Sequence, residues 1–443
     1  MTAGFGQRLG PIHLAEGVTR GNALTFLYAA FFSVCLLAFL SFVQPLVLDA
    51  HLGIPRSHQG RVTFALGLTQ EIAMLLLVGP FGALVDKAGR RVMYTLGLAW
   101  IGVGYILYPL AGTLAALIAT RFFFSIGAAM VGTAMATVLA DAPQERSRGL
   151  LVGVTGALQG VGVMFGVLVL SRLPLRFEAL GLSDDLAGRY TLWIGAALCF
   201  ITALVCRLGL QCDPADRRPE GRPSLLQLVA TGVRTARANR RLALGYFASF
   251  VARGDMVVIG TFFSLWLMQA GIAQGMTRPA AMAKAGMMYG IAQLTGLFWA
   301  PILGWLMDRH DRVTIVVLSM GLAALGYAVV GLASDPFSAA MPFKMMLLGT
   351  GELSCIIAAQ ALLGEQAPTR LRGSVMGVAA VCSAIGVLFS TSLGGWLFDH
   401  WRPGAPFVMI AAVNSVVMGL ALWVRLTTPR VACAPRPASS PTS

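Results

Sequence analysis

The sequence predicts an all-α membrane protein whose twelve transmembrane helices form two six-helix bundles related by an internal repeat. Hydrophobic residues make up 57% of its 443 residues and charged residues only 12%, and the mean hydropathy is +0.75. This composition is typical of a protein that crosses a membrane many times, and it excludes an ordinary soluble domain. Apolar runs of membrane-spanning length indicate the number of helices, and a half-length repeat indicates their division into two bundles.

The apolar runs are each close to the ~20 residues that an α-helix needs to cross the hydrocarbon core of a bilayer. We expect spans at about 24–48, 62–84, 92–109, 114–139, 149–172, 190–210, 243–269, 284–306, 313–333, 341–364, 373–398 and 405–425. The first run is too long for the apolar core of a signal peptide, so we expect it to remain as the first span. An even number of spans places both chain termini on the same side of the membrane.

One polar segment separates the sixth span from the seventh. Residues 211–241 carry seven arginines, with prolines in the first half, and we interpret them as a cytoplasmic linker. The linker divides the chain into an N-terminal bundle at 1–210 and a C-terminal bundle at 242–426, and we expect 427–443 to be a disordered tail. We interpret the linker as a solvated tether, and a short amphipathic helix over residues 225–237 at the membrane surface is the alternative.

Lysine and arginine residues indicate which side of the membrane holds the termini. The segments that share a side with the N-terminus contain 22 of the 33 Lys and Arg residues, the opposite loops contain 8, and the remaining 3 lie within spans. Because cytoplasmic loops carry an excess of positive charge, we expect both termini in the cytoplasm. The sequence has no Asn-x-Ser/Thr sequon, which fits a bacterial inner membrane. Attraction to anionic lipids also accounts for the net charge of +14, without any role for nucleic acid.

The loop between the second and third spans carries the most informative motif. Residues 79–91 read GPFGALVDKAGRR, in which glycines permit close helix packing and a sharp turn before a basic cluster. This stretch resembles the signature loop between helices 2 and 3 of the major facilitator superfamily, whose pattern is roughly G-x-L-x-D-R-x-G-R-R/K. The matching positions are Gly82, Asp86, Lys87, Gly89, Arg90 and Arg91, with a lysine in place of the first arginine. The resemblance implies the twelve-helix transporter fold of that superfamily.

A second, weaker copy of this loop occurs half a chain later. Residues 304–312 read GWLMDRHDR, and Asp308 lies 222 positions after Asp86. Arg121 early in the fourth span likewise corresponds to Lys344 early in the tenth, at a separation of 223 positions. A half-length repeat in an apolar chain is typical of transporters in which two related bundles flank a central site.

Charged residues at the ends of these spans form the predicted cytoplasmic gate, together with the motif glycines. The family resemblance implies that Asp86 caps the N-terminus of the eleventh helix near Gly373, where a carboxylate meets the helix dipole favourably. We expect Arg90 to pair with Asp141 at the inner end of the fourth helix. The second half has corresponding residues, which are Asp308, Arg312 and Glu365. These clusters are expected to hold the cytoplasmic side shut in the outward-open state and to separate when the bundles rock.

Five ionisable residues lie inside the predicted spans, where an unpaired charge is costly and is therefore a candidate for function. They are Glu71, Arg121, Arg253, Asp255 and Glu352. The run RFFFSIGAA from Arg121 resembles the helix-4 motif R-x-x-x-G-x-G-A-A of the superfamily, whose arginine is implied in proton transfer in proton-coupled members. We therefore predict a proton-coupling pair of Glu71 and Arg121, with a permanent structural ion pair as the alternative.

The tripeptide Arg253-Gly254-Asp255 in the seventh span carries two opposite charges that do not face each other, because they are two positions apart on one helix. Glu352 on the tenth span is the expected partner of Arg253, and a polar group on a neighbouring helix is the expected partner of Asp255. We predict that Arg253 binds an anionic group of the substrate while Asp255 or Glu352 titrates. Gating salt bridges that stabilise one conformation are the alternative.

Uncharged polar side chains within the spans complete the predicted substrate cavity. The candidates are Gln44, Gln159, Tyr289, Gln293 and Gln360, with Asn414 on the last span. Helix packing satisfies many polar groups of this kind, so a structural role is the alternative for each. The seven cysteines include no Cys-x-x-Cys pair and the five histidines lie in tails or loops, so metal and redox chemistry are unsupported.

These features indicate a secondary active transporter that works by rocker-switch alternating access, and they include no catalytic or nucleotide-binding motif of an enzyme. We expect proton-coupled symport of a small polar or anionic organic metabolite, driven by an ion gradient without a cofactor. The expected partners are the substrate, the proton and the bilayer, and a monomer is expected to suffice. The alternative is a proton-coupled exporter of drugs or lipophilic cations, although the fifth span lacks the Gly-Pro pair typical of drug–proton antiporters. A membrane sensor that transports nothing is a more remote alternative.

Overall fold

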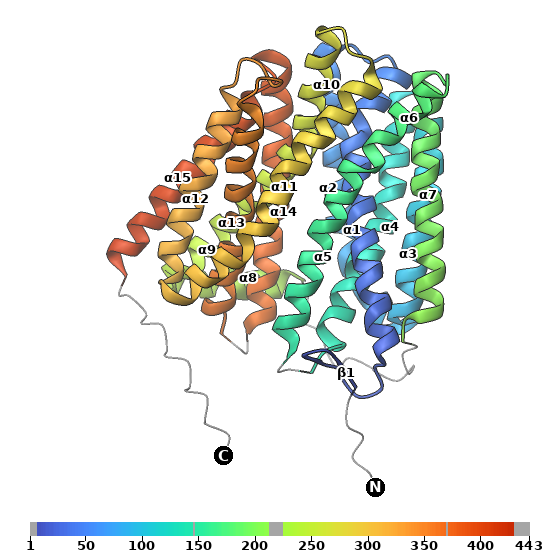
Figure 1. The fold of residues 1–443 in the computed structure, drawn as a ribbon. Helices are drawn as coiled ribbons and strands as arrows, with labels where there is room; N and C mark the ends of the chain where they lie inside the picture. Colours follow the sequence, from blue (N-terminus) through green and yellow to red (C-terminus); the bar gives the residue numbers. More distant parts are fainter. Residues whose placement is uncertain (1–6, 145–146, 212–224, 369–370, 429–443) are drawn as a thin grey trace.

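The computed structural model describes residues 7–144, 147–211, 225–368 and 371–428. Within these residues, twelve helices are long and apolar enough to cross a membrane. The predicted fold class, an all-α membrane protein with twelve transmembrane helices, is confirmed. Figure 1 shows the helices side by side, with the start of the first and the end of the last at the same end of the molecule. We refer to that end as the terminal end and to the other as the opposite end.

The helices continue beyond several of the predicted boundaries. The first half contains α1 (Arg20–Leu46), η1 (Val47–His51), η2 (Arg56–His58), α2 (Gln59–Ala88), α3 (Arg90–Leu107), η3 (Tyr108–Leu110), α4 (Leu114–Asp141), α5 (Arg148–Leu168), η5 (Leu170–Arg172), α6 (Leu173–Ala179) and α7 (Asp184–Gly209). The second half contains α8 (Leu225–Ala238), α9 (Arg240–Val258), η6 (Ile259–Phe263), α10 (Ser264–Ala273), α11 (Arg278–Arg309), α12 (Arg312–Gly331), α13 (Met341–Gln366), α14 (Arg372–His400) and α15 (Ala405–Thr427). The π-helical segment η6 joins α9 to α10, so that these two helices form one span.

Polar side chains cap the starts of many helices. The hydroxyl of Thr113 accepts a hydrogen bond from the backbone of α4, and Thr277 does the same for α11. The carboxylate of Asp311 accepts from the backbone N–H of Val313 at the start of α12. Such caps satisfy N–H groups that have no partner within the helix and contribute about 1 kcal/mol each. They fix the points where the chain enters the bundle.

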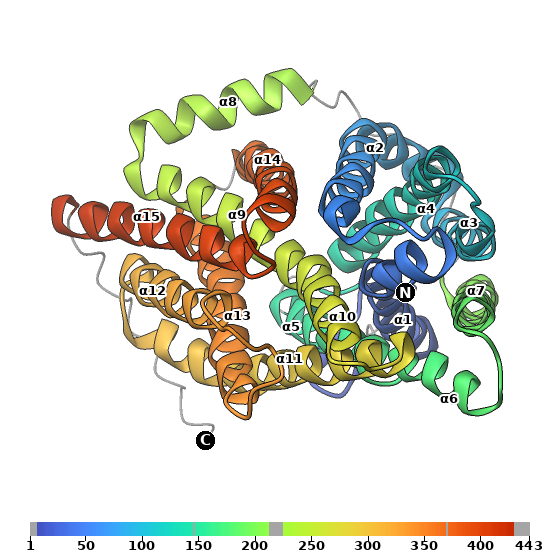
Figure 2. The same ribbon diagram turned by 90° about the horizontal axis from the view of Figure 1, so that it is seen from above.

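The helices of each half pack mainly against one another. In the first half α1 lies against α5 and α7, α2 against α4, and α3 against α4 and α7. In the second half α9 lies against α13 and α14, α11 against α13, and α12 against α13 and α15. The halves meet along two seams, α2 with α14 and α5 with α11, which can be followed in Figure 2. An interface between two helix bundles therefore runs through the middle of the molecule.

The chain before the first span forms a hairpin that the sequence reading does not predict. Strand β1 (Arg8–Leu9) pairs with strand β2 (Ile12–His13) in an antiparallel arrangement. The backbone N–H of His13 donates to the hydroxyl of Ser147 (3.0 Å), and that of Gln144 donates to the carbonyl of His13 (2.9 Å). The hairpin is thereby attached to the loop between α4 and α5. Two-residue strands are too short to leave a periodic pattern in the sequence.

The polar segment between the halves contains α8, at the place of the alternative amphipathic helix. This helix lies against α9 and α14, and the Tyr246 hydroxyl donates to the carbonyl of Gly232 at 3.3 Å. Figure 2 shows α8 at the edge of the second half, beside α14. The remainder of the predicted linker, 212–224, and the tail at 429–443 lie outside the described residues.

Candidate functional site

Ion pairs join the two halves at the opposite end of the molecule. Arg278, at the start of α11, pairs with Asp49 at the end of the first span and with Asp184 (3.2 Å) at the start of α7. The neighbouring hydroxyl of Thr277 donates to the carboxylate of Glu178 at 3.1 Å. One short stretch of the second half thus contacts η1, α6 and α7 of the first half.

A second set of contacts joins α2 to the second half at the same end. The carboxylate of Asp399, near the end of α14, accepts hydrogen bonds from the backbone N–H groups of Gly60 and Arg61, both at 2.9 Å. Free N–H groups and the helix dipole favour a carboxylate at a helix N-terminus. The side chain of Gln269 also donates to Gln59 at 2.9 Å. The opposite end is therefore closed.

At the terminal end, the described hydrogen bonds and ion pairs remain within each half. Arg90 pairs with Asp141 at 2.6 Å, which confirms the predicted pairing, and Arg312 pairs with Glu365 at 3.5 Å. Gly89 makes the turn between α2 and α3 with a φ of 88°, a conformation that favours glycine. The gate role of these residues remains a prediction. The side chains of Asp86 and Asp308, and Gly373, lie outside what the structure describes.

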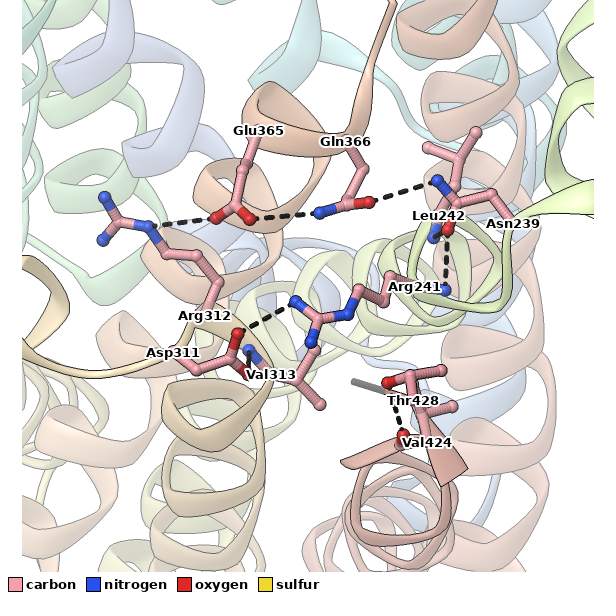
Figure 3. Close-up of polar contacts among 10 residues, drawn as sticks. All are labelled: Asn239, Arg241, Leu242, Asp311, Arg312, Val313, Glu365, Gln366, Val424 and Thr428. Atoms are coloured by element: carbon pink, nitrogen blue, oxygen red, sulfur yellow. Dashed lines mark hydrogen bonds and ion pairs between the residues drawn. The ribbon is translucent and has the colours of Figure 1, made fainter. Parts of the chain in front are cut away.

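A wider polar network surrounds the second of these ion pairs, as Figure 3 shows. Gln366 donates to Glu365 and accepts from Asn239, both at 3.1 Å. Close by, Arg241 pairs with Asp311 at 2.9 Å. Sequence reasoning misses Arg241, because it assigns that residue to a solvated linker. The sequence feature that could have identified it is Asn239, two residues earlier, which caps α9 and places Arg241 in the first turn of a transmembrane helix.

Glycine contacts show where the two halves touch. A Cβ atom added to Gly286 or Gly290 of α11 would collide with atoms near the end of α5. A Cβ atom added to Gly153 or Gly156, at the start of α5, would meet nothing within 4 Å, and the same holds for Gly82 of the motif. The halves therefore pack tightly toward the opposite end, and no described polar contact closes the terminal end.

Glu71 on α2 lies in the field of two arginines that come from different halves. Its carboxylate is attracted by Arg253 on α9 and, more weakly, by Arg121 on α4. Among the described residues, none forms a hydrogen bond or an ion pair with Glu71. The predicted direct pairing of Glu71 with Arg121 is therefore not found. The reason is that Arg121 points toward Ser41 on α1 instead.

Arg121 is a buried cation whose hydrogen-bonding capacity is mostly unused. Its side chain is 3% exposed, and Nη2 donates to the hydroxyl of Ser41 at 2.8 Å. The guanidinium also lies 5.8 Å from the centre of the Phe124 ring, within the range of a cation–π interaction. Its Nε and Nη1 groups have no hydrogen-bond partner among the described residues. The site thus presents positive charge and free donors.

Arg253 and Asp255 occupy different faces of α9, as predicted. Arg253 is exposed, and its described polar contact is with the sulfur of Met256 at 3.8 Å. The predicted ion pair between Arg253 and Glu352 is not found, because Glu352 is buried within the second half whereas Arg253 points out of it. The carboxylate that attracts Arg253 is Glu71, in the other half.

The second half buries two carboxylates in its own interior. Asp255 is fully buried and accepts hydrogen bonds from the amide of Asn414 on α15 at 3.1 and 3.0 Å, which confirms the predicted polar partner on a neighbouring helix. Glu352 on α13 is 4% exposed and has no hydrogen bond among the described residues. The two carboxylates repel each other. Within the described residues, no group of three or more His, Cys, Asp or Glu side chains is placed to hold a metal ion.

The uncharged candidates differ in whether a substrate could reach them in this conformation. Gln44 is buried and donates to the hydroxyl of Thr63 at 3.3 Å. Tyr289 is also buried, and it stacks across the interface on Phe42 with ring centres 5.7 Å apart. These two side chains are part of the packing. Side chains that stay exposed or half-buried are Gln159, Gln293 and Gln360.

Comparison with known families identifies the chain. The family model described as Major Facilitator Superfamily matches residues 26–391 and 246–442. The chain belongs to the major facilitator superfamily. Its family and fold are those of an integral membrane transporter and not those of an enzyme. The two motif resemblances in the sequence are explained by this membership.

The proteins that this chain resembles include members with different names and roles. The magnetosome protein MamZ of Paramagnetospirillum magneticum is 28% identical over 394 residues, which cover 86% of this chain but only 59% of MamZ. The multidrug resistance protein MdtH of Salmonella typhi is 25% identical over 370 residues, covering 82% of this chain and 84% of that protein. The crystal structure of the nucleoside transporter NupG has a TM-score of 0.69 at 15% identity, over 93% of this chain and all of NupG. At that identity the similarity shows the shared fold alone.

Proposed function

We propose that the protein is a secondary active transporter that moves a small organic anion together with a proton by alternating access. The observation that carries this proposal is the position of Glu71, which lies in the field of Arg253 from the other half and of Arg121 from its own. Charged side chains inside spans are costly, and they mark substrate and proton pathways. Here three of them interact across the interface of two related bundles, where such transporters bind their substrates.

Coupling follows from competition for the two arginines. While Glu71 is ionised, it offsets part of the positive charge of Arg253 and Arg121, which weakens the attraction for an incoming anion. A proton on Glu71 removes that competition, and the anion then forms charge-assisted hydrogen bonds with arginine. Proton and anion therefore bind together. Arg253 is the proposed principal ligand, and the accessible amides are those of Gln159, Gln293 and Gln360.

Alternating access requires the closed end to open and the open end to close. In this conformation the ion pairs of Arg278 close the opposite end, so the substrate enters from the terminal end. Access from the opposite end requires those ion pairs to break while the motif loops of both halves come together. The excess of Lys and Arg residues on the side of the chain termini supports a cytoplasmic location for the terminal end, in a bacterial cell. One chain provides both halves of the site, so a monomer suffices.

The substitution Glu71→Gln tests this coupling. A thermal-shift screen of organic anions, sugars, amino acids and lipophilic cations first identifies a ligand, because a ligand that binds the folded state raises its stability. Uptake is then measured in proteoliposomes with an imposed pH gradient. We expect Glu71→Gln to abolish uphill accumulation while substrate exchange persists, whereas Glu16→Gln, at an exposed carboxylate before the first span, should change neither. Accumulation that still follows the pH gradient in Glu71→Gln would exclude Glu71 as the proton carrier.

Export of lipophilic cations is the second candidate function. It is favoured by the similarity to MdtH and by the two carboxylates that the second half buries, Asp255 and Glu352. In that case lipophilic cations, and not anions, should stabilise the protein in the same screen, and Asp255→Asn or Glu352→Gln should remove the effect. Stabilisation by an anion that is lost in Arg253→Gln supports the symporter.

A further inference from the structure

Hydrogen-bond donors without acceptors lie together inside the first half. Arg121 is buried, and its Nε and Nη1 groups have no partner among the described residues. The hydroxyl of Tyr108, also fully buried, has no described partner either. The two side chains are close enough to interact electrostatically. Buried polar groups are nearly always hydrogen-bonded, so a group of open donors indicates a ligand that is absent from this conformation.

Three elements of the first half contribute to this donor cluster, which we define by Ser41, Tyr108 and Arg121. Arg121 lies early in α4, Tyr108 begins η3, and Ser41 on α1 accepts the hydrogen bond of Arg121 Nη2. The neighbouring Tyr105 is different, because its hydroxyl already donates to the carbonyl of Leu36. Tyr105 is therefore a matched control for Tyr108: both are buried tyrosines near Arg121, and only one of them has a free hydroxyl.

The chemistry of the donor cluster selects an anion. A guanidinium is always charged and has donors but no acceptor, and a phenolic hydroxyl can donate as well. Glu71 attracts Arg121 but does not bond to it, so the donors remain open in its presence. A water molecule would accept a hydrogen bond and leave the buried positive charge unbalanced. An acidic group of a ligand satisfies both the donors and the charge.

We infer that the donor cluster binds one acidic group of the transported molecule, and that the substrate is a small dicarboxylate bridging Arg121 in the first half and Arg253 in the second. This inference rests on the proposed function. Once Glu71 carries a proton, the two arginines contribute a charge of +2, and a dianion balances that charge inside the membrane. A ligand held by both halves also stabilises the conformation in which they close around it.

The test compares dicarboxylates with monocarboxylates of the same chain length. Succinate and glutarate are titrated against the purified protein beside butyrate and valerate, with thermal stabilisation as the measure of affinity. We expect the dicarboxylates to bind at least about tenfold more tightly. Tyr108→Phe should weaken dicarboxylate binding about tenfold and leave monocarboxylate binding unchanged, because it removes one hydrogen bond to a charged group. Tyr105→Phe should change neither.

Arg121→Gln supplies a second measurement that does not depend on the tyrosine. It should remove the preference for dicarboxylates and retain the weak monocarboxylate binding at Arg253, and size-exclusion chromatography checks that each variant is folded. Equal affinities for the two classes, or a dicarboxylate preference unchanged in Tyr108→Phe and Arg121→Gln, would overturn the inference and leave anion symport standing. Failure of every carboxylate to bind, together with stabilisation by lipophilic cations, would overturn the proposed function itself.

Discussion

The two halves of the molecule share one scaffold but differ in the charges that they bury away from the helix ends. In the first half, Arg121 is a buried cation with unused hydrogen-bonding capacity. In the second half, two carboxylates are buried instead, Asp255 and Glu352. Positions related by the repeat differ accordingly: Lys344, which is only half-buried, corresponds to Arg121, and Gln293 lies 222 residues after Glu71.

Unlike the buried charges, the ion pairs at the terminal end occur at related positions in both halves. Arg90–Asp141 in the first half has its counterpart in Arg312–Glu365, at separations of 222 and 224 residues. The halves thus agree in the contacts that fix helix ends and differ in the charges near the centre. The chemistry of the transporter therefore depends on the residues that differ between the two halves of the repeat, since site residues vary freely on a fixed scaffold.

The largest effect is expected where the halves differ most, at Arg121 and Lys344. Arg121→Gln should lower anion uptake by about 100-fold or more, because it removes a buried charge whose hydrogen bonds contribute about 1.5–3 kcal/mol each. Lys344→Gln should lower uptake by less than about twofold, since the lysine lies near a helix end and is half-buried. Initial uptake rates in proteoliposomes measure both. Equal losses in the two variants would contradict a functional asymmetry of the halves.

A smaller effect, on stability, is expected from the carboxylates of the second half. Asp255→Asn should reduce the free energy of unfolding by about 1–3 kcal/mol, because the new amide group brings a donor toward the Asn414 amide that now donates to both oxygens. Glu352→Gln should leave the free energy of unfolding unchanged or raise it, since Glu352 has no described hydrogen bond to lose and a neutral amide removes its repulsion with Asp255. Thermal unfolding in detergent compares the two. A greater loss in Glu352→Gln would show that its carboxylate is bonded after all.

The smallest effects are expected where the halves agree. Arg90→Gln and Arg312→Gln should each reduce the free energy of unfolding by about 0.2–1 kcal/mol, because both ion pairs are partly exposed. Arg90→Gln should have the larger effect, since its ion pair is shorter, 2.6 Å against 3.5 Å. Thermal unfolding at low and high salt distinguishes them. A loss of several kcal/mol in either variant would contradict the description of these pairs as local contacts.

Much of the fold can be predicted from the sequence, because hydrophobic length and repeated loops are local signals. The apolar runs locate the spans, and the repeat locates Arg90–Asp141 and its counterpart. The two-residue spacing of Arg253 and Asp255 is likewise sufficient to place them on different faces of one helix. The positions of the spans and of Arg253 and Asp255 depend on helix geometry within one segment, which sequence periodicity reports directly.

The candidate site could be predicted only as a set of residues, because their pairing depends on how helices are rotated against each other. Glu71 is drawn to Arg253 more than to the expected Arg121, and Arg253 does not meet Glu352. Packing against neighbouring helices sets those rotations, and the sequence pattern of one helix contains little information about that packing. The same holds for the closed end: the contacts of Arg278 and Asp399 join segments that are more than 90 residues apart.

The hairpin ahead of the first span has a consequence for the order in which the protein is made. Its backbone partner, Gln144, and the hydroxyl of Ser147 are more than 130 residues away, beyond the fourth helix. The hairpin therefore cannot find its place until four helices have emerged from the ribosome and entered the bilayer. Until then, its backbone N–H and C=O groups must form hydrogen bonds with water or with a chaperone. Docking of this segment therefore follows the synthesis of the fourth helix and of the loop after it.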